Sequence, residues 1–330
     1  MPASTVKRVT AADVARSLGL SRATVGFVLN DTPGQTIPET TRERVLAEAK
    51  RLGYRANTAA RALASGRSRI ILLVLPDWPL DYSMRTHLDE ASLALDEAGY
   101  SLVTTTPHPG GQAQPLWETL RPDVVIGMTP FSADRLTQIR ASGVEHVIPS
   151  VPAGDPHAVG DLGYVDGPRL QVEHLLAQGR RQLAFAASPD PRLSDLVAQR
   201  RELASRTLRE RTGDGFVAEA AIDERDAAAR VAEWIDASVD GVVAYNDDVG
   251  AVVLGAALRG GIRVPDELAI VGHDDSPLAR LLVPSLSSVR IDTAGIGRYL
   301  ADLALSAATG SPPPMAGPET DAYLVERETS

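Results

Sequence analysis

The feature that most constrains the fold is an alternation, from residue 70 onward, of short apolar runs with longer amphipathic stretches. The first apolar run, Ile70 to Leu75, precedes a helical pattern at about 84–98 that ends at Gly99. Strands that alternate with helices favour a parallel sheet covered on both faces, and the number of repeats predicts two doubly wound lobes. The later predicted strands lie at 102–103, 124–126, near 147, 183–186, 216–220, 241–245 and 268–272. The helices between them are predicted at 132–142, 167–178, 193–211 and 226–237, and a last one ends at Gly260.

Polar side chains follow several of these predicted strands. Ligands of open parallel sheets bind beyond the carboxyl ends of the strands, so these residues are candidates for a binding site. They are Asp77, Trp78 and Tyr82 after the first strand, Asn246, Asp247 and Asp248 after a later one, and His273, Asp274, Asp275 and Ser276 after another.

The first 54 residues follow a purely helical pattern. Thr10 precedes the run 11–18 with Asp13 three residues later, which is a capping-box signature, and Gly19 ends the helix. Ser21 stands at the N-cap of a second helix, in which Val25, Val28 and Leu29 recur at helical spacing. Pro38 opens a third helix, with Val45, Leu46, Ala49 and Leu52 on one stripe and Gly53 as its stop.

Two short helices joined at a glycine turn are typical of a helix-turn-helix, in which the start of the second helix contacts base edges. Arg22, Ala23 and Phe27 lie on the outward face of that helix and suit this role. A three-helix bundle with a polar face and no role in DNA binding fits the same pattern.

Charge favours the DNA-binding interpretation. Residues 1–68 contain eleven Lys or Arg and five Asp or Glu, a net charge of +6, whereas the whole chain carries −10, so residues 69–330 carry −16. Because non-specific affinity for DNA comes from neutralising phosphates, the basic segment would bind a duplex while the acidic remainder is repelled.

Composition excludes several other classes. The chain has no cysteine and no run of about 18 apolar residues, and its first residues lack a signal-peptide core, so we expect a cytoplasmic protein with no membrane segment. We expect no cofactor and no metal site. A periplasmic sugar receptor would have a signal and no basic head. An enzyme would use His273 or the pair Asp274–Asp275 as acid and base, but adjacent residues on a turn usually diverge.

Several motifs, in this order along the chain, resemble the LacI/GalR (lac repressor-type) family. In the head they are Val9-Thr10, Asp13-Val14-Ala15, Ser21, Ala23-Thr24-Val25, Val28-Leu29-Asn30, Arg42-Glu43-Arg44-Val45 and Leu52-Gly53-Tyr54-Arg55; beyond it they are Asn246-Asp247, Gly261-Ile262-Arg263-Val264-Pro265, the run from Val271 to Leu278, Pro284-Ser285-Leu286 and Val289-Arg290.

The resemblance implies a transcriptional regulator that acts as a repressor. It would bind double-stranded DNA at a near-palindromic operator as a homodimer. It implies a head over 1–56, a hinge helix and linker over 57–68, and a two-lobed periplasmic-binding-protein-like domain over 69–330. The first lobe would comprise about 69–161 and 291–330, and the second about 162–290. The tail lacks a leucine heptad, so a coiled-coil tetramer is not expected.

The resemblance also assigns DNA-contacting residues. Leu63 matches a hinge leucine that wedges into the minor groove, although simple helix packing is the alternative, and Gly26-Phe27 replaces the family's usual Ser-Arg. The expected DNA contacts are Thr10, Ser21, Arg22, Ala23, Thr24, Phe27, Asn30, Tyr54, Asn57, Ala60 and Leu63.

A small effector, such as a sugar or another polar metabolite, would bind between the lobes. Each charged candidate could instead be a solvated surface group, Arg201 fits its position as well as Arg200, and core packing is the alternative for the aromatic residues. The expected effector contacts are Trp78, Tyr82, Arg200, Asn246, Asp247 and Asp274.

Overall fold

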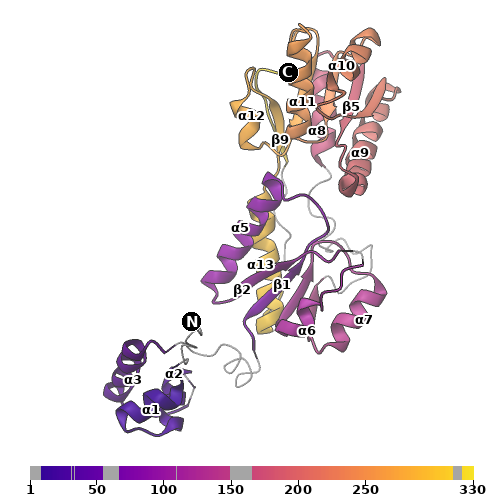
Figure 1. Cartoon of the computed structure of the whole chain (residues 1–330). Coiled ribbons are helices and arrows are strands. Elements are labelled where there is room, and N and C mark those ends of the chain that lie inside the picture. Colours follow the sequence, from indigo (N-terminus) through magenta and orange to yellow (C-terminus); the bar gives the residue numbers. More distant parts are fainter. Residues whose placement is uncertain are drawn as a thin grey trace, which may run out of the picture. The chain divides into compact units, whose positions relative to one another are not determined.

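The computed structural model describes residues 9–30, 32, 34–54, 67–108, 110–148, 166–314 and 322–330. The chain divides into two compact units, Met1–Arg69 and Ile70–Ser330, and each is described by itself (Figure 1). The expected hinge contacts Asn57, Ala60 and Leu63 lie outside the described residues.

The head consists of α1 (Ala11–Leu18), α2 (Arg22–Leu29) and α3 (Glu39–Leu52). Thr10 and Asp13 form the predicted capping box at the start of α1, and Gly19 ends the helix in the left-handed conformation at φ 65°. The three helices share a small core built from Val14, Ala15, Val25, Val28, Val45 and Ala49.

Leu46 was predicted to face this core, but it is 49% exposed. It directly follows the buried Val45, and one residue turns an α-helix by about 100°. The narrow stripe that α3 presents to two short helices therefore accommodates Val45 and Ala49 but leaves Leu46 outside.

The first lobe of the second unit has a parallel sheet in the order β2-β1-β3-β4. Successive β1 side chains point to opposite faces: Ile71 and Leu73 pack in the core beneath α5 and α13, and Leu72 and Val74 in that beneath α6 and α7. The elements are β1 (Ile70–Val74), α5 (Tyr82–Glu97), β2 (Ser101–Thr105), α6 (Leu116–Leu120), β3 (Val124–Gly127), α7 (Ala133–Ala141), β4 (His146–Ile148) and α13 (Thr293–Thr309).

The second lobe has a sheet in the order β10-β9-β8-β7-β5-β6, with all neighbours parallel except β9 and β10. Helices α8 and α9 pack together, as do α10 and α11 (Figure 1). The elements are α8 (Asp166–Ala177), β5 (Leu183–Ala187), the 3-10 turn η2 (Pro191–Leu193), α9 (Ser194–Thr212), β6 (Ala218–Ala221), α10 (Ala227–Asp236), β7 (Gly241–Ala244), α11 (Asp247–Arg259), β8 (Ala269–His273), α12 (Pro277–Leu281), β9 (Ser287–Arg290) and β10 (Tyr323–Val325).

This architecture confirms the predicted fold class, a helical head followed by an α/β unit with parallel sheets. None of the helices within the described residues has the length and apolar character needed to cross a membrane.

One lobe boundary needs correction. We expected 291–330 to belong to the first lobe, and α13 does pack against α5 there. The chain then returns, and β10 pairs antiparallel with β9 in the second lobe. Thr329 fixes this return, because its hydroxyl donates to the carbonyl of Ile270 at 2.8 Å while its own carbonyl accepts from the Ile270 N–H at 2.8 Å.

Helices α5 and α13 approach so closely at Gly297 that a Cβ there would lie 2.3 Å from the carbonyl oxygen of His87. Gly297→Ala should therefore force the helices apart and lower the free energy of unfolding by about 1–3 kcal/mol. Urea unfolding followed by tryptophan fluorescence measures this loss. Gly215→Ala is the control, because nothing lies within 4 Å of a Cβ at Gly215. Equal effects of the two substitutions would contradict the close approach.

Candidate functional sites

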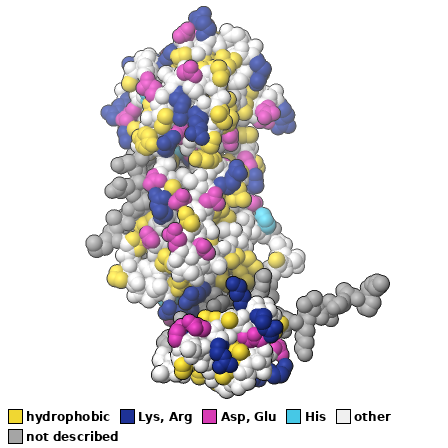
Figure 2. Space-filling model, turned by 90° about the vertical axis from the view of Figure 1, so that its left-hand side faces the viewer, with side chains coloured by type: hydrophobic (Ala, Val, Ile, Leu, Met, Phe, Trp, Pro, Cys, Tyr) yellow, Lys and Arg dark blue, Asp and Glu magenta, His cyan; other side chains and the backbone are white. Residues whose placement is uncertain are grey.

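Helix α2 presents the start of its first turn to solvent. Ser21, Arg22 and Ala23 are exposed, whereas Val25 and Val28 are buried in the head core. The Ser21 hydroxyl accepts from the N–H of Thr24 at 3.0 Å, so the cap fixes the direction in which this turn leaves the head. Figure 2 shows Lys and Arg side chains at the surface of the head, as the net charge of this segment requires.

The other expected DNA contacts of the head differ in how exposed they are and in whether their polar groups are already hydrogen-bonded. The Thr10 hydroxyl is occupied by the capping box, donating to Asp13 Oδ2 at 2.7 Å. Phe27 and Tyr54 are half-buried, and Asn30 is exposed as the C-cap of α2. A Cβ at Gly26 would have nothing within 4 Å, so this face of α2 is open.

In the second unit, Arg200 lies at the carboxyl edge of the second sheet. Its guanidinium donates from Nη1 to the carbonyl of Tyr245 at 2.6 Å and from Nη2 to Asp274 Oδ1 at 3.2 Å, and it lies 4.6 Å from the centre of the Tyr245 ring. The neighbouring Arg201 instead pairs with Glu219 at 3.0 Å on the outside of the lobe. The geometry thus favours Arg200 over Arg201 as a residue of this edge.

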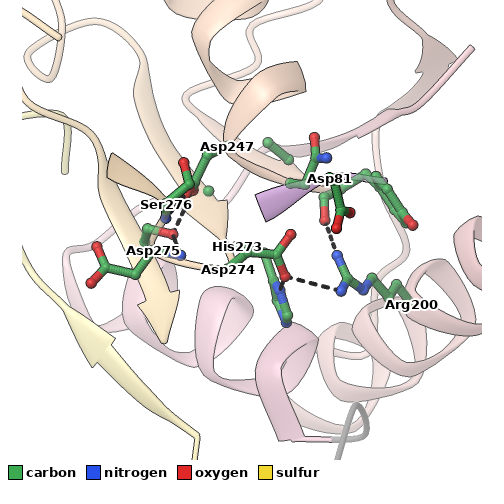
Figure 3. A network of polar contacts seen from close by, with 12 residues as sticks. Asp81, Arg200, Asp247, His273, Asp274, Asp275 and Ser276 are labelled. Carbon is green, nitrogen blue, oxygen red and sulfur yellow. Dashed lines mark hydrogen bonds and ion pairs between the residues drawn. The ribbon is translucent and has the colours of Figure 1, made fainter. Parts of the chain in front are cut away.

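Asp274 accepts from two partners within this network (Figure 3). Its Oδ1 also contacts His273 Nδ1 at 2.7 Å. Burial would raise the pKa of Asp274, but Arg200 and His273 outweigh it and hold that pKa well below its usual value. Burial, followed by the charge of Arg200, lowers the pKa of the fully buried His273. Asp274 is therefore a fixed, ionised acceptor.

Asp275 points away from Asp274 (Figure 3). One of its oxygens accepts from Arg290 Nε at 2.6 Å and the other from Arg327 Nη2 at 2.5 Å. These bonds connect the loop after β8 to β9 and to the segment after β10. The two adjacent carboxylates thus diverge, as expected, and do not form an acid–base pair.

Asp247 does not occupy the ligand-facing position expected of it. It is 2% exposed, its Oδ2 accepts from the Ser276 N–H at 2.6 Å, and its Oδ1 accepts from the Ser288 hydroxyl at 2.5 Å. Burial raises its pKa to about 7. The carboxyl therefore connects the start of α11 to the loop after β8, and its neighbour Asp248 is exposed instead.

Two hollows lie at the strand ends, and Asp274 lines the larger of them. One of about 280 Å³ is lined by Pro79, Asp81, Ser188, Pro189, Asp190, Leu193, Ile222, Asp223, Glu224, Asn246, Asp248, Val249 and Val252. The other, of about 550 Å³, is lined by Tyr82, Thr86, Asp274, Asp275, Arg290, Ile291, Asp292, Thr293, Ala294 and Tyr323. Both combine residues of the first lobe with residues that follow strands of the second.

Two of the three remaining expected effector contacts line these hollows, and the third does not. Asn246 lines the smaller one while its Oδ1 caps α11 by accepting from the Val249 N–H at 3.0 Å. Tyr82, 40% exposed, lines the larger one. Trp78 is partly buried and packs against the apolar cores of both lobes, which is the packing alternative for this residue.

Our sequence prediction did not name Asp81 or Asp190, and it named Asp248 as a strand-end candidate but left it out of the expected effector contacts; all three line the smaller hollow. Asp81 follows β1, Asp190 follows β5 and Asp248 follows β7, so the rule that ligands bind beyond strand ends applies to all three. The rule does not say which of several neighbouring residues faces the ligand. That depends on the direction of each side chain, which changes from one residue to the next at a helix start or in a turn.

The pKa of Asp247 predicts a pH dependence of stability. Because that pKa is about 7 in the folded state and 3.8 ordinarily, the folded chain keeps a proton that the unfolded chain releases. Its contribution to the free energy of unfolding is therefore present below pH 4 and is lost as the pH rises to 7. Between pH 5 and 7 the free energy of unfolding of the wild type should fall by about 2–3 kcal/mol more than that of Asp247→Asn, whose side chain cannot ionise.

Urea unfolding at the two pH values, followed by tryptophan fluorescence, measures this difference. Asp236→Asn is the matched control, since Asp236 is exposed at the end of α10. An Asp247→Asn variant with the same pH dependence as the wild type and this control would show that Asp247 is ionised in the folded chain.

The chain matches two families of known domains. Residues 10–57 match the bacterial regulatory proteins of the lacI family, and residues 172–330 match a periplasmic binding protein-like domain. The ribose operon repressor of Bacillus subtilis is 30% identical over 306 residues, which cover 90% of each chain. The transcriptional regulator GalS of Salmonella typhimurium is 29% identical over 317 residues, covering 92% of this chain and 91% of GalS.

The fold has a counterpart among solved structures. The lac repressor dimer bound to operator and the anti-inducer ONPF aligns with a TM-score of 0.76 at 22% identity, covering 98% of this chain and 99% of that chain. The exposed start of α2, the two-lobed α/β unit and these relatives lead to one conclusion: the chain belongs to the lacI family of bacterial regulatory proteins and is a helix-turn-helix transcriptional regulator, not an enzyme.

Proposed function

We propose that this regulator is a repressor that binds a near-palindromic operator as a homodimer and that a small molecule bound between the lobes of its second unit changes its affinity for DNA. The observation that carries the proposal is the buried Arg200–Asp274 pair at strand ends that also hold two hollows, in a chain that has an exposed recognition turn. The solved lac repressor relative, a dimer on operator with an anti-inducer, supports it. Such a repressor acts in the cytoplasm, where its operator lies.

The head, residues 1–56 in this proposal, supplies both affinity and specificity. Its net positive charge attracts the phosphates, and the start of α2 enters the major groove. Arg22 is the long, exposed hydrogen-bond donor of that turn and suits the edge of a guanine. The open face at Gly26 allows close approach of the backbone, and Phe27 beside it can contact a thymine methyl group.

The hinge, 57–68, connects head and body in this proposal and includes the expected contacts Asn57, Ala60 and Leu63. A segment with only about two turns of helix is marginally stable alone, so its order depends on what it contacts. A ligand that alters closure of the two lobes would change the spacing of two hinges in a dimer. Each tenfold preference of a ligand for one state contributes about 1.4 kcal/mol to this coupling.

Selection of bound duplexes from a random pool tests the DNA half of the proposal directly. The full chain should enrich a sequence with inverted symmetry, because two identical heads read two half-sites. Repeating the selection with metabolites present should reduce or increase the enrichment for at least one of them. Enrichment of a single asymmetric site would contradict the dimeric arrangement.

Two substitutions in α2 test how the head reads DNA. Arg22→Ala should lower affinity for the selected duplex by about 1–3 kcal/mol relative to scrambled DNA. Gly26→Ala should stabilise the head by about 1 kcal/mol, because Ala is the better helix former, yet weaken operator binding by blocking close approach. Fluorescence anisotropy gives the affinities and amide exchange of the head gives its stability.

Arg230→Ala, which removes an exposed charge from the second lobe, is the control. Should Arg22→Ala and Arg230→Ala have the same effect on selected and scrambled duplexes, α2 would not be the helix that reads bases.

A further inference from the structure

The turn that follows β8 has an uncommon backbone conformation. Asp274 and Asp275 both have positive φ angles, 94° and 43°, and no other two consecutive non-glycine residues do so within the part of the chain that the structure describes. This conformation is disfavoured for residues with a Cβ, so it persists only where the surroundings hold it in place. The contacts of the turn therefore indicate what it does.

Backbone contacts hold the turn to the neighbouring strand. The Asp274 N–H donates to the carbonyl of Val289 at 2.8 Å, and the Asp275 N–H donates to the Ser288 hydroxyl at 3.0 Å. The two carboxylates then point apart, that of Asp274 toward Arg200 (Figure 3). Because both residues belong to one tightly held turn, a displacement of Asp274 also moves Asp275.

The carboxylate of Asp275 joins two passages of the chain between the lobes. Its side chain is 1% exposed and accepts from Arg290 at 2.6 Å and from Arg327 at 2.5 Å. Arg290 is the last residue of β9, after which the chain leaves for the first lobe, and Arg327 follows β10, to which the chain returns. Arg290 also pairs in register with Tyr323, the first residue of β10, and donates to its hydroxyl at 3.1 Å.

The first lobe holds the other end of the departing passage. Asp292 is the N-cap of α13 and lies 3.8 Å from Arg298, which pairs with Glu90 of α5 at 2.8 Å. Only Ile291, which is 4% exposed, lies between Asp292 and the residue that Asp275 holds, Arg290. Hinges between domains are a few residues at the ends of elements. A passage this short conveys a movement of Arg290 directly to α13.

Open space beside the turn leaves room for such a movement. The larger hollow, of about 550 Å³, is lined by Asp274, Asp275 and Arg290 on the side of the second lobe and by Tyr82 and Thr86 of α5 on the side of the first. Here the lobes face each other across a space rather than through packed side chains.

We propose that Asp275 is a positioning residue that fixes the arrangement of the two lobes and conveys any change at Asp274 to the passages between them. This inference rests on the proposed function, since it concerns the regulation of the same cleft. Loss of an ion pair leaves a buried carboxylate uncompensated, so the turn and both passages would rearrange together.

Distances between the lobes test this proposal on the full chain without effector or DNA. The chain has no cysteine, so Glu118→Cys on α6 and Glu210→Cys on α9 accept one spin label on each lobe at exposed positions. An excess of unlabelled chain keeps labels on two copies from meeting. Pulsed electron paramagnetic resonance then measures the distribution of distances, which should be single and narrow.

Two substitutions break the contacts of Asp275. Asp275→Asn removes the charge, and Arg290→Gln removes one of its two cations from a side chain that is 48% exposed. Both should broaden or displace the distribution, and Arg290→Gln alone decides should Asp275→Asn not fold. Arg230→Gln is the matched control, because Arg230 is 46% exposed and forms two ion pairs along α10. Asp236→Asn is the control for the lost carboxylate.

Melting temperatures separate positioning from stability alone. An ion pair with a purely structural role would lower the melting temperature and leave the distances within the folded chain unchanged. The positioning role predicts a changed distribution at temperatures well below the melting transition, where each variant is folded.

A double-mutant cycle tests whether Asp274 acts through Asp275. Asp274→Asn weakens the contact with Arg200 and should displace the distribution of the labelled chain. In the Arg290→Gln background the same substitution should have an effect at most about half as large, because coupled residues do not act additively.

Two outcomes would overturn the inference. If Asp275→Asn and Arg290→Gln gave the distribution of the two controls, Asp275 would not fix the lobes. If Asp274→Asn had equal effects in both backgrounds, Asp274 would not act through Asp275. Neither measurement uses DNA, so a chain that bound no duplex sequence-specifically would contradict the proposed function alone, whereas unchanged distances in variants that still bind the operator would contradict this inference alone.

Discussion

The placement of charge is the constraint on which this molecule depends. Residues 1–68 carry a net +6 and residues 69–330 a net −16, so only one of the two parts can approach a polyphosphate favourably. The basic part is also the one whose core is smallest, and side-chain caps fix the starts of its two short helices α1 and α2. Its exposed surface is therefore free to carry arginines, and the turn that begins with Ser21 and Arg22 is held outward by the same caps that stabilise it.

Within the acidic part, the cost of burying carboxylates determines the architecture of the strand ends. Asp274 is ionised because Arg200 and His273 contact it. Asp275 forms ion pairs with two arginines, one from β9 and one from the segment after β10. Asp247 has no cation beside it, and burial raises its pKa even though it accepts hydrogen bonds from Ser276 and Ser288. Structural carboxylates are thus satisfied within the chain.

The sequence predicted the helices and strands better than it predicted the residues of the effector site. Capping residues such as Thr10, glycine stops such as Gly19, and apolar strand runs act locally, so their pattern predicted most helices and strands within a few residues. The strand β10 has three residues and pairs with β9 across a long return of the chain, so no local pattern marks it. The choice between Asp247 and Asp248 depends on which way adjacent residues of a helix start point, and packing between α11 and the loop after β8 decides it.

The most direct test of the account is the salt dependence of duplex binding by the full chain and by a fragment containing residues 70–330, the second compact unit. The affinity of the full chain for its selected duplex should fall roughly a thousandfold between about 50 and 200 mM salt, as counterion release at six or more phosphates requires. The fragment should bind no duplex at any of these concentrations. Equal binding by the fragment, or a full-chain affinity that salt leaves unchanged, would contradict the claim that charge segregation directs this regulator to DNA.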